Sequence, residues 1–150
     1  MLGIDDAEHM EDATSGTPLV TALACPVGEA PSNGPMLSGK SKIVLSTKSL
    51  AYQIYGQQEI EEEHACGFNL NPDFQHLFEE KGLRIVGRGE DQEARVIELV
   101  GHRFFVGTLF LPQFSSREGQ PHPLITAFLE AAMEFSKMNP NLDRRLSTNP

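Results

Sequence analysis

Two side chains near the middle of the sequence could form a nucleophilic pair. Cys66 follows His64 by two residues, and residues two apart on a strand point to the same face of a sheet. An imidazole can take the proton of a thiol and so produce the reactive thiolate. A working site also needs a third group that orients the base and donors that stabilise the oxyanion. Because those groups are not indicated nearby, we interpret Cys66 as a packed or surface thiol.

The other cysteine, Cys25, follows an apolar stretch in the context Leu-Ala-Cys-Pro and could face a pocket. Free cysteine packs so often as a small hydrophobe that a core thiol is the favoured interpretation. Cys25 and Cys66 are the only cysteines, and neither belongs to a CxxC pair. Spacing therefore predicts neither a disulfide framework nor a zinc site.

Two acidic stretches contain a histidine and could be taken for metal sites. Metal ligands must converge in space, and adjacency in the sequence does not provide convergence. We therefore interpret both stretches as solvated, and predict no metal and no cofactor. The first stretch consists of Glu59, Glu61, Glu62, Glu63 and His64, and the second of Asp5, Asp6, Glu8, His9, Glu11 and Asp12.

The composition limits the kinds of partner. A length of 150 residues suits one domain with a single core. The net charge of -9 produces a negative field that repels phosphate backbones and anionic lipid. The sequence has no apolar run long enough to span a bilayer, and residues 1–12 are acidic where a signal peptide would be basic and then apolar. We expect a soluble, cytoplasmic protein that binds neither nucleic acid nor membrane.

In the first half of the chain, residues 1–17 show no sustained period and are predicted to be irregular. The stretch 59–69 is ambiguous, but the even spacing of Ile60, His64, Cys66 and Phe68 favours a strand. The remaining predictions for this half are strands over 19–27 and 42–46, a loop over 28–41 and a helical turn over 50–55.

In the second half, Asn71 as N-cap, Pro72 at the first helical position and Gly82 at the C-terminal end predict a helix over 72–81. Apolar residues at helical spacing predict a final helix over 124–138 that lies against the sheet. The other predictions are strands over 83–86, 94–100 and 104–111, a loop over 115–123 and a disordered tail over 139–150. Residues 1–138 would then form one domain.

Several motifs follow one another along the chain. Residues 104–114 read FFVGTLFLPQF, followed by SR at 116–117 and PHPL at 121–124. Upstream, Tyr55-Gly56 precedes EEHACGFNLN at 62–71, LFEEKGL stands at 77–83 with Val86-Gly87 after it, and residues 2–7 read LGIDDA. This set resembles the C-terminal half of the class I glutamine amidotransferase domain of CTP synthases. The family's motifs there are F-V-x-x-Q-F-H-P-E-F, R-P-x-x-P-H-P-L, Y-G-x-x-x-I-x-E-R-H-R-H-R-Y-E-x-N, Q-L-E-x-A-G-L-x-x-S-G and V-L-G-x-x-D-A.

The resemblance covers about residues 2–138 and is poor over 14–42. It implies an α/β fold, a partial class I amidotransferase-like (flavodoxin-like) domain with a mixed sheet, antiparallel strands and flanking helices. It also implies a glutaminase site built from a cysteine, a histidine and a carboxylate. The family's nucleophile turn, G-x-C-x-G, would precede Leu2.

The family's two other catalytic positions carry different residues in this chain. Leu111 stands in place of the histidine and Gln113 in place of the carboxylate. Leucine cannot carry a proton, and an amide cannot stabilise an imidazolium by charge. The resemblance therefore implies that no member of the catalytic set is intact.

The segment that contacts glutamine in the family is also altered. Ala65, Cys66 and Gly67 stand where arginine, histidine and arginine are expected, and Phe68 replaces a tyrosine. Loss of the guanidinium groups removes a bidentate partner for the substrate carboxylate. His122 belongs to the family's turn into the last helix, and we interpret it as structural.

Three functional hypotheses stay open. The leading one is a catalytically degenerate amidotransferase-like protein with an interaction or regulatory role. The second is a divergent amidotransferase or hydrolase that uses Cys66 or Cys25, or that is completed by a separately encoded first half. The third is a degraded paralogue without a selected activity. Because the first half of such a domain builds most of the central sheet, we expect a homo-oligomer, a protein partner that completes the sheet, or a fragment of a longer product.

Overall fold

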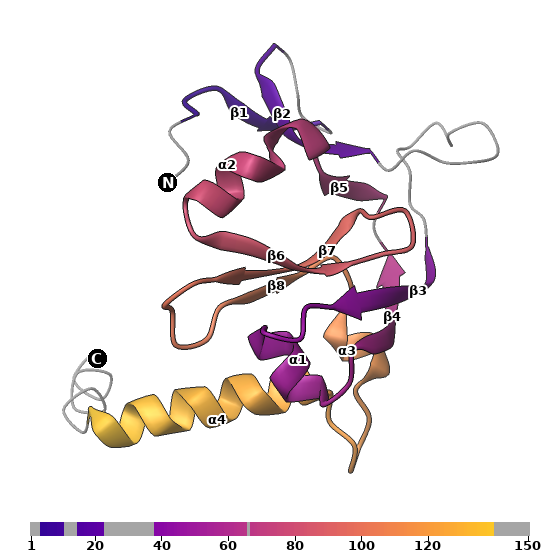
Figure 1. Ribbon diagram of the computed structural model, residues 1–150. Coiled ribbons are helices and arrows are strands. Elements are labelled where there is room, and N and C mark those ends of the chain that lie inside the picture. The colour runs from indigo at the N-terminus through magenta and orange to yellow at the C-terminus, as the bar shows by residue number, and fades with distance from the viewer. Residues whose placement is uncertain (1–3, 11–14, 23–37, 66, 140–150) are drawn as a thin grey trace, which may run out of the picture.

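The strands of the computed structural model form two sheets (Figure 1), and the structure describes residues 4–10, 15–22, 38–65 and 67–139. The smaller sheet has the order β1-β2-β5, in which β1 runs parallel and β5 antiparallel to β2. The larger sheet has the order β4-β3-β6-β7-β8, with every neighbouring pair antiparallel. The strands are β1 (Ala7–His9), β2 (Thr17–Ala22), β3 (Ser38–Leu45), β4 (Glu59–Ala65), β5 (Phe68–Leu70), β6 (Leu83–Arg88), β7 (Ala94–Leu99) and β8 (Val106–Thr108).

The helices begin and end at residues suited to those places. Ser49 caps α1, because its Oγ accepts a hydrogen bond from the Tyr52 N–H at 3.0 Å, and Gly56 ends the helix with φ 68°. Asn71 caps the next helical segment through its Oδ1, which accepts from the Asp73 N–H at 3.1 Å. The helices are α1 (Leu50–Tyr55), the 3-10 helix η1 (Pro72–Phe74), α2 (Gln75–Glu80), α3 (Pro112–Ser115) and α4 (Pro123–Met138).

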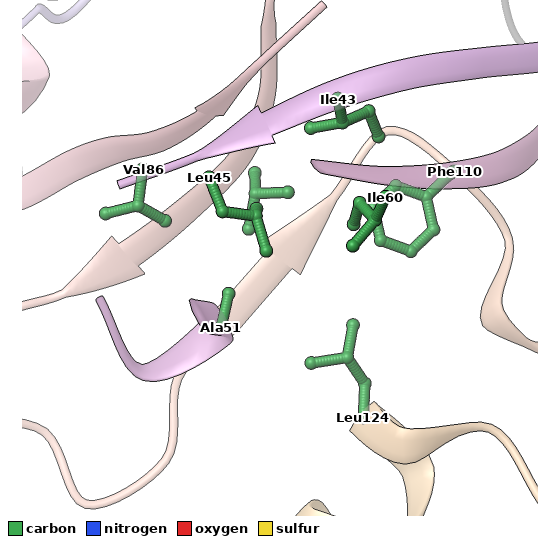
Figure 2. Close-up of a cluster of buried hydrophobic side chains, with 8 residues drawn as sticks. Ile43, Leu45, Ala51, Ile60, Val86, Phe110 and Leu124 are labelled. Carbon is green, nitrogen blue, oxygen red and sulfur yellow. The ribbon is translucent and has the colours of Figure 1, made fainter. Parts of the chain in front are cut away.

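One face of the larger sheet carries the main core (Figure 2). Side chains from the strands meet Ala51 of α1 and Leu124 of α4, which close the core from the helix side (Figure 2). The core residues are Ile43, Leu45, Ala51, Ile60, Val86, Val96, Phe110 and Leu124. The first turn of α4 is therefore held by hydrophobic burial.

Gly87 allows β6 and β7 to approach closely. A Cβ at this position would lie 2.7 Å from Cγ2 of Val96, which is too short for van der Waals contact. The pairing of β6 with β7 shifts register on both sides of Gly87, as expected of a bulge at a glycine.

The predicted α/β fold with antiparallel strands and flanking helices is confirmed. The mixed character belongs to the smaller sheet, whereas the larger sheet is wholly antiparallel. The strands over 42–46, 83–86 and 94–100 and the helices over 50–55 and 124–138 correspond to observed elements. Within the described residues, no helix is both long and apolar enough to cross a bilayer.

Several predictions for the first half were wrong. Residues 1–17 are not wholly irregular, because Ala7–His9 pairs with β2, which begins at Thr17. Residues 38–41, predicted as part of a loop, belong to β3 and pair with β4. The stretch 59–69 is two strands in different sheets. In each case a partner strand supplies hydrogen bonds that local sequence cannot reveal. Residues 23–37, which include most of the predicted 28–41 loop, lie outside the described residues.

Some predictions for the second half of the chain also differ from the structure. Of the predicted strand over 104–111, only Val106–Thr108 forms a strand. Pro112–Ser115 forms the helix α3, which was not predicted. The predicted helix over 72–81 divides into η1 and α2. The last helix lies against the sheet only at its start, because Leu124 joins the core while Phe128, Leu129 and Met133 are more than half exposed. Residues 140–150, most of the predicted tail, lie outside the described residues.

Candidate functional site

The structure brings together a buried acid and a buried histidine that are 60 residues apart in the chain. Glu62 on β4 and His122 before α4 are 5% and 3% exposed. Glu62 Oε1 lies 2.9 Å from His122 Nε2. The Tyr55 hydroxyl donates to Glu62 Oε1 at 2.6 Å, and the Ser115 hydroxyl donates to Glu62 Oε2 at 3.1 Å. We call Tyr55, Glu62, Ser115 and His122 the buried polar cluster after its two buried members, Glu62 and His122; Tyr55 is half-buried and Ser115 is exposed.

Both ring nitrogens of His122 are engaged. Nδ1 accepts a hydrogen bond from the Leu124 N–H at 3.2 Å, so it caps the N-terminus of α4. In a neutral imidazole the proton then resides on Nε2, which donates to Glu62. An imidazole without a free nitrogen cannot exchange a proton with a substrate. The cluster therefore supports the structural interpretation of His122.

The Tyr55 phenol is held in its protonated form. Burial raises the pKa of Tyr55 far above its ordinary value of 10.0, and the hydrogen bond and charge of Glu62 raise it further. The phenol also lies 3.2 Å from His122 Nε2, with its ring edge-on to the imidazole. Tyr55 thus acts as a donor to the carboxylate.

Local sequence explains how each member reaches the cluster. Along β4, the alternation of a strand turns Ile60 and Glu62 inward while Glu59 and Glu61 stay exposed. Pro123 at the first helical position orients His122 as the cap of α4. The acidic run 59–63 was predicted to be solvated, and for Glu62 this was wrong. Burial is tolerated because three donors surround its carboxylate.

The two positions that the resemblance assigns to the catalytic histidine and carboxylate lie at the start of α3. Leu111, half-buried, precedes the helix, and its N–H donates to the carbonyl of Glu63 on β4 at 3.0 Å. Gln113 is exposed on the same helix. The helix ends at Ser115, so one short helix connects these positions to the buried polar cluster. Side chains at 111 and 113 have no proton-carrying group.

The positions that the resemblance assigns to substrate contact, Ala65, Gly67 and Phe68, lie at the end of β4 and the start of β5. Ala65 ends β4, two residues after the Glu63 carbonyl that binds Leu111. Gly67 is buried, and Phe68 on β5 packs against the His9 ring with centroids 4.5 Å apart. The Phe68 ring is thus used in contact between β5 and β1. Two surface grooves of about 440 Å³ are lined by other residues.

The structure describes the imidazole of the possible thiol-imidazole pair but neither cysteine. Cys66 and Cys25 lie outside the described residues. His64 is placed on β4, where its Nδ1 lies 3.2 Å from the Ser41 hydroxyl. Burial lowers the pKa of His64, and the positive charge of Arg95 lowers it further.

The acidic side chains of the two stretches make separate contacts and do not converge on one point. Glu61 forms an exposed ion pair with Lys40 at 3.0 Å. In the N-terminal stretch, Glu8 accepts from the Gly16 N–H and Asp6 accepts from the Thr17 hydroxyl. Glu11 and Asp12 lie outside the described residues. Among the residues that are described, no group of three or more acidic, histidine or cysteine side chains could hold a metal ion.

Comparison with known proteins finds relatives among the CTP synthases. The chain is 35% identical over 137 residues to a CTP synthase of Syntrophus aciditrophicus, which covers 90% of this chain and 26% of the relative. A CTP synthase of Sulfurisphaera tokodaii is 34% identical over 133 residues, which are 88% of this chain and 25% of the relative. The chain therefore spans about a quarter of the length of the curated relatives it matches. No protein-family model matches it.

Among solved structures, the glutaminase domain of Trypanosoma brucei CTPS with bound acivicin matches with a TM-score of 0.79 at 22% identity. The match covers 89% of this chain and 53% of that chain. The fold is that of a class I glutamine amidotransferase domain. Within this class, the chain is related to the CTP synthase-type domains, since CTP synthases match about 90% of its length.

Proposed function

We propose that this chain is a catalytically degenerate glutamine amidotransferase-like protein whose role is interaction or regulation. The observation that carries the proposal is the pair of residues at the start of α3, Leu111 and Gln113. They stand where the family motif has its histidine and carboxylate, and neither can transfer a proton to or from a thiol.

The residues that the chain keeps support the same proposal. Tyr55, Glu62 and His122 match the tyrosine, glutamate and histidine of the family motifs quoted above, and all three belong to the buried polar cluster. Their hydrogen bonds join β4, α1 and α4. The chain has thus retained family residues that hold elements together and changed those that would do chemistry.

A glutaminase assay of the purified chain tests the proposal. We expect no ammonia release above the uncatalysed rate, and no heat of glutamine binding in calorimetry, because the arginine donors for the substrate carboxylate are missing at positions 65 and 67. The variants Cys66→Ser and Cys25→Ser are the controls. Ammonia release that disappears in either variant would show a working thiol and overturn the proposal.

A double reversion, Leu111→His with Gln113→Glu, adds a second arm. It restores the residue types of the family motif at α3. We expect the reverted chain to stay inactive by itself. To hydrolyse glutamine, an imidazole and a carboxylate still need a thiol on a tight turn and an oxyanion site. A reverted chain that turns over glutamine would mean that only two substitutions separate this protein from an enzyme. A cytoplasmic location belongs to the proposal and is tested by fractionation.

A further inference from the structure

The outer edge of β8 carries backbone groups that no other strand engages. β8 is the last strand of the larger sheet, so it pairs only with β7. After β8, the Leu109 N–H donates to the Arg95 carbonyl at 2.9 Å. Because bonding alternates along an antiparallel strand, Val106 and Thr108 direct their N–H and C=O groups away from β7. Within the part of the chain that the structure describes, no hydrogen bond engages these groups.

This edge lacks the usual protection against a further strand. Proteins protect exposed edges with charged side chains, proline or a bulge. β4, at the opposite edge of the same sheet, carries four glutamates. In contrast, residues 105–109 read FVGTL, without a charge or a proline, and β8 pairs with β7 without a register shift. The edge of β8 is therefore suited to accept an extended segment.

A cavity of about 150 Å³ lies beside the edge. Aliphatic residues line most of it, namely Leu70 of β5, Ile97 of β7 and Leu109. Gly107, which pairs with Ile97, also lines the cavity but contributes no side chain. Residues directly opposite one another in a sheet share a face. The side chain of an added residue opposite Gly107 would therefore point into this cavity.

The cavity favours an uncharged side chain. Arg95 also lines it, but Glu93 Oε1 accepts from Arg95 Nε at 2.8 Å and balances the charge. A leucine, isoleucine or valine thus matches both the size and the lining of the cavity. Because β8 has only three residues, its main-chain hydrogen bonds alone would hold a segment weakly. The side chain in the cavity must supply much of the affinity.

We propose that the edge of β8 binds an extended segment of a partner protein, with an aliphatic residue opposite Gly107. The segment would extend the larger sheet by bonding to Val106 and Thr108, and its aliphatic side chain would fill the cavity. A second copy of this chain, paired about the middle of β8, would place Gly107 opposite Gly107 and leave the cavity unfilled. The inference rests on the interaction role proposed above and makes no use of glutamine.

A displayed library of random peptides of about ten residues is the probe. Selection against the full chain should enrich peptides that share one aliphatic position among residues of high strand propensity. Replacement of that residue by glycine should weaken binding by about 10- to 100-fold, the usual effect of burying one aliphatic side chain. A selection that yields no binder, or binders without a shared aliphatic position, would contradict the proposal.

Amide hydrogen exchange locates the bound peptide. In the free chain, the N–H groups of Val106 and Thr108 should exchange fast, whereas the Leu109 N–H is protected by its bond to Arg95. A selected peptide should slow exchange at Val106 and Thr108 by at least about tenfold and leave Leu109 nearly unchanged. Protection confined to other elements would refute the proposed edge. Slow exchange at both residues in the free chain, increasing with its concentration, would identify a second copy as the occupant instead.

A pair of variants tests the backbone contact. Thr108→Pro removes one outward N–H and should abolish peptide binding, and proline is tolerated on an edge strand where its nitrogen faces away from the neighbouring strand. Thr108→Val is the matched control, because both variants lose the hydroxyl bond to the Phe110 carbonyl but valine keeps the N–H. The valine variant should bind as wild type does. Circular dichroism verifies that both variants fold.

A chemical change in the peptide tests the same contact without altering the protein. N-methylation of the peptide amides that face β8 should abolish binding, whereas N-methylation of those that face away should not. This comparison decides the matter if Thr108→Pro does not fold. Binding that survives methylation of the facing amides would overturn the proposal. Glutamine hydrolysis is measured separately, so the proposed function and this inference can fail independently.

Discussion

The carboxylate of Glu62 and the imidazole of His122 meet at 2.9 Å in the interior, one from β4 and the other from the cap of α4. This contact fixes the start of α4 against the larger sheet. Tyr55 and Ser115 complete the hydrogen bonds of the carboxylate from α1 and α3. Four elements that are distant in the sequence therefore depend on one acidic side chain.

Glu62→Ala is expected to destabilise the fold strongly. The substitution leaves the Tyr55 hydroxyl and His122 Nε2 without their acceptor, and each buried donor left unsatisfied costs about 1–3 kcal/mol. Urea denaturation followed by circular dichroism measures the loss. Glu59→Ala, at an exposed position of the same strand, is the matched control and should change stability by less than about 0.5 kcal/mol. Equal losses in the two variants would contradict the role of the cluster.

Tyr55 should make the protein sensitive to alkali. Its pKa is raised in the folded state, so the unfolded state releases the phenolic proton first, and the stability that the proton provides is lost as pH rises above 10.0. In a Tyr52→Phe background, phenolate absorbance should appear together with unfolding rather than before it. The Tyr55→Phe variant should lack this alkaline loss. Phenolate absorbance in a chain that is still folded would refute the prediction.

His64 should produce a loss of stability on the acid side. Burial and Arg95 lower its pKa, so the unfolded state binds a proton more readily than the folded state. Stability from this source is complete above the ordinary pKa of 6.5 and falls as pH decreases below it. The His64→Gln variant should gain stability relative to wild type as the solution is acidified. His76→Gln on α2 serves as the control for losing an imidazole at an exposed position.

Gly87→Ala should destabilise the larger sheet by about 1–3 kcal/mol, the usual cost of overpacking. The new Cβ would meet the Val96 side chain at 2.7 Å, and both strands are buried there. Gly39→Ala is the matched control, because a Cβ on β3 would meet only the His64 ring at an ordinary 3.6 Å. Thermal denaturation compares the two variants. A Gly39→Ala variant that melts as early as Gly87→Ala would show that loss of glycine itself, rather than Val96, is responsible.

Local signals in the sequence predicted α1, α4 and the helical segment that begins at Pro72. Asn71 and Gly82 lie at the ends of the helical segment they were expected to bound, and the final helix begins within one residue of its prediction. These signals lie within a few residues of one another, so the sequence carries them directly. The resemblance likewise rests on residue types alone, and it is the basis on which Leu111 and Gln113 are assigned to the family's catalytic positions.

Pairing between distant segments was harder to predict. The strand Ala7–His9 and the start of β3 at Ser38 depend on partners β2 and β4 for their hydrogen bonds. A strand is stabilised by its neighbour more than by its own residues. The short helix α3 was not predicted for a related reason. The apolar run that ends at Leu111 is typical of a strand, but the Leu111 N–H binds the distant Glu63 carbonyl and the helix begins at the next residue.

The sequence by itself determined the class of fold, the ends of α1 and α4 and the absence of a proton carrier at positions 111 and 113, because each depends on residue identity or on short-range spacing. Only the tertiary structure decided which glutamate of the acidic run is buried and what His122 does. Glu59, Glu61, Glu62 and Glu63 are chemically alike, and Glu62 alone is surrounded by donors from α1, α3 and α4. That environment exists only after residues as distant as 55 and 122 have come together.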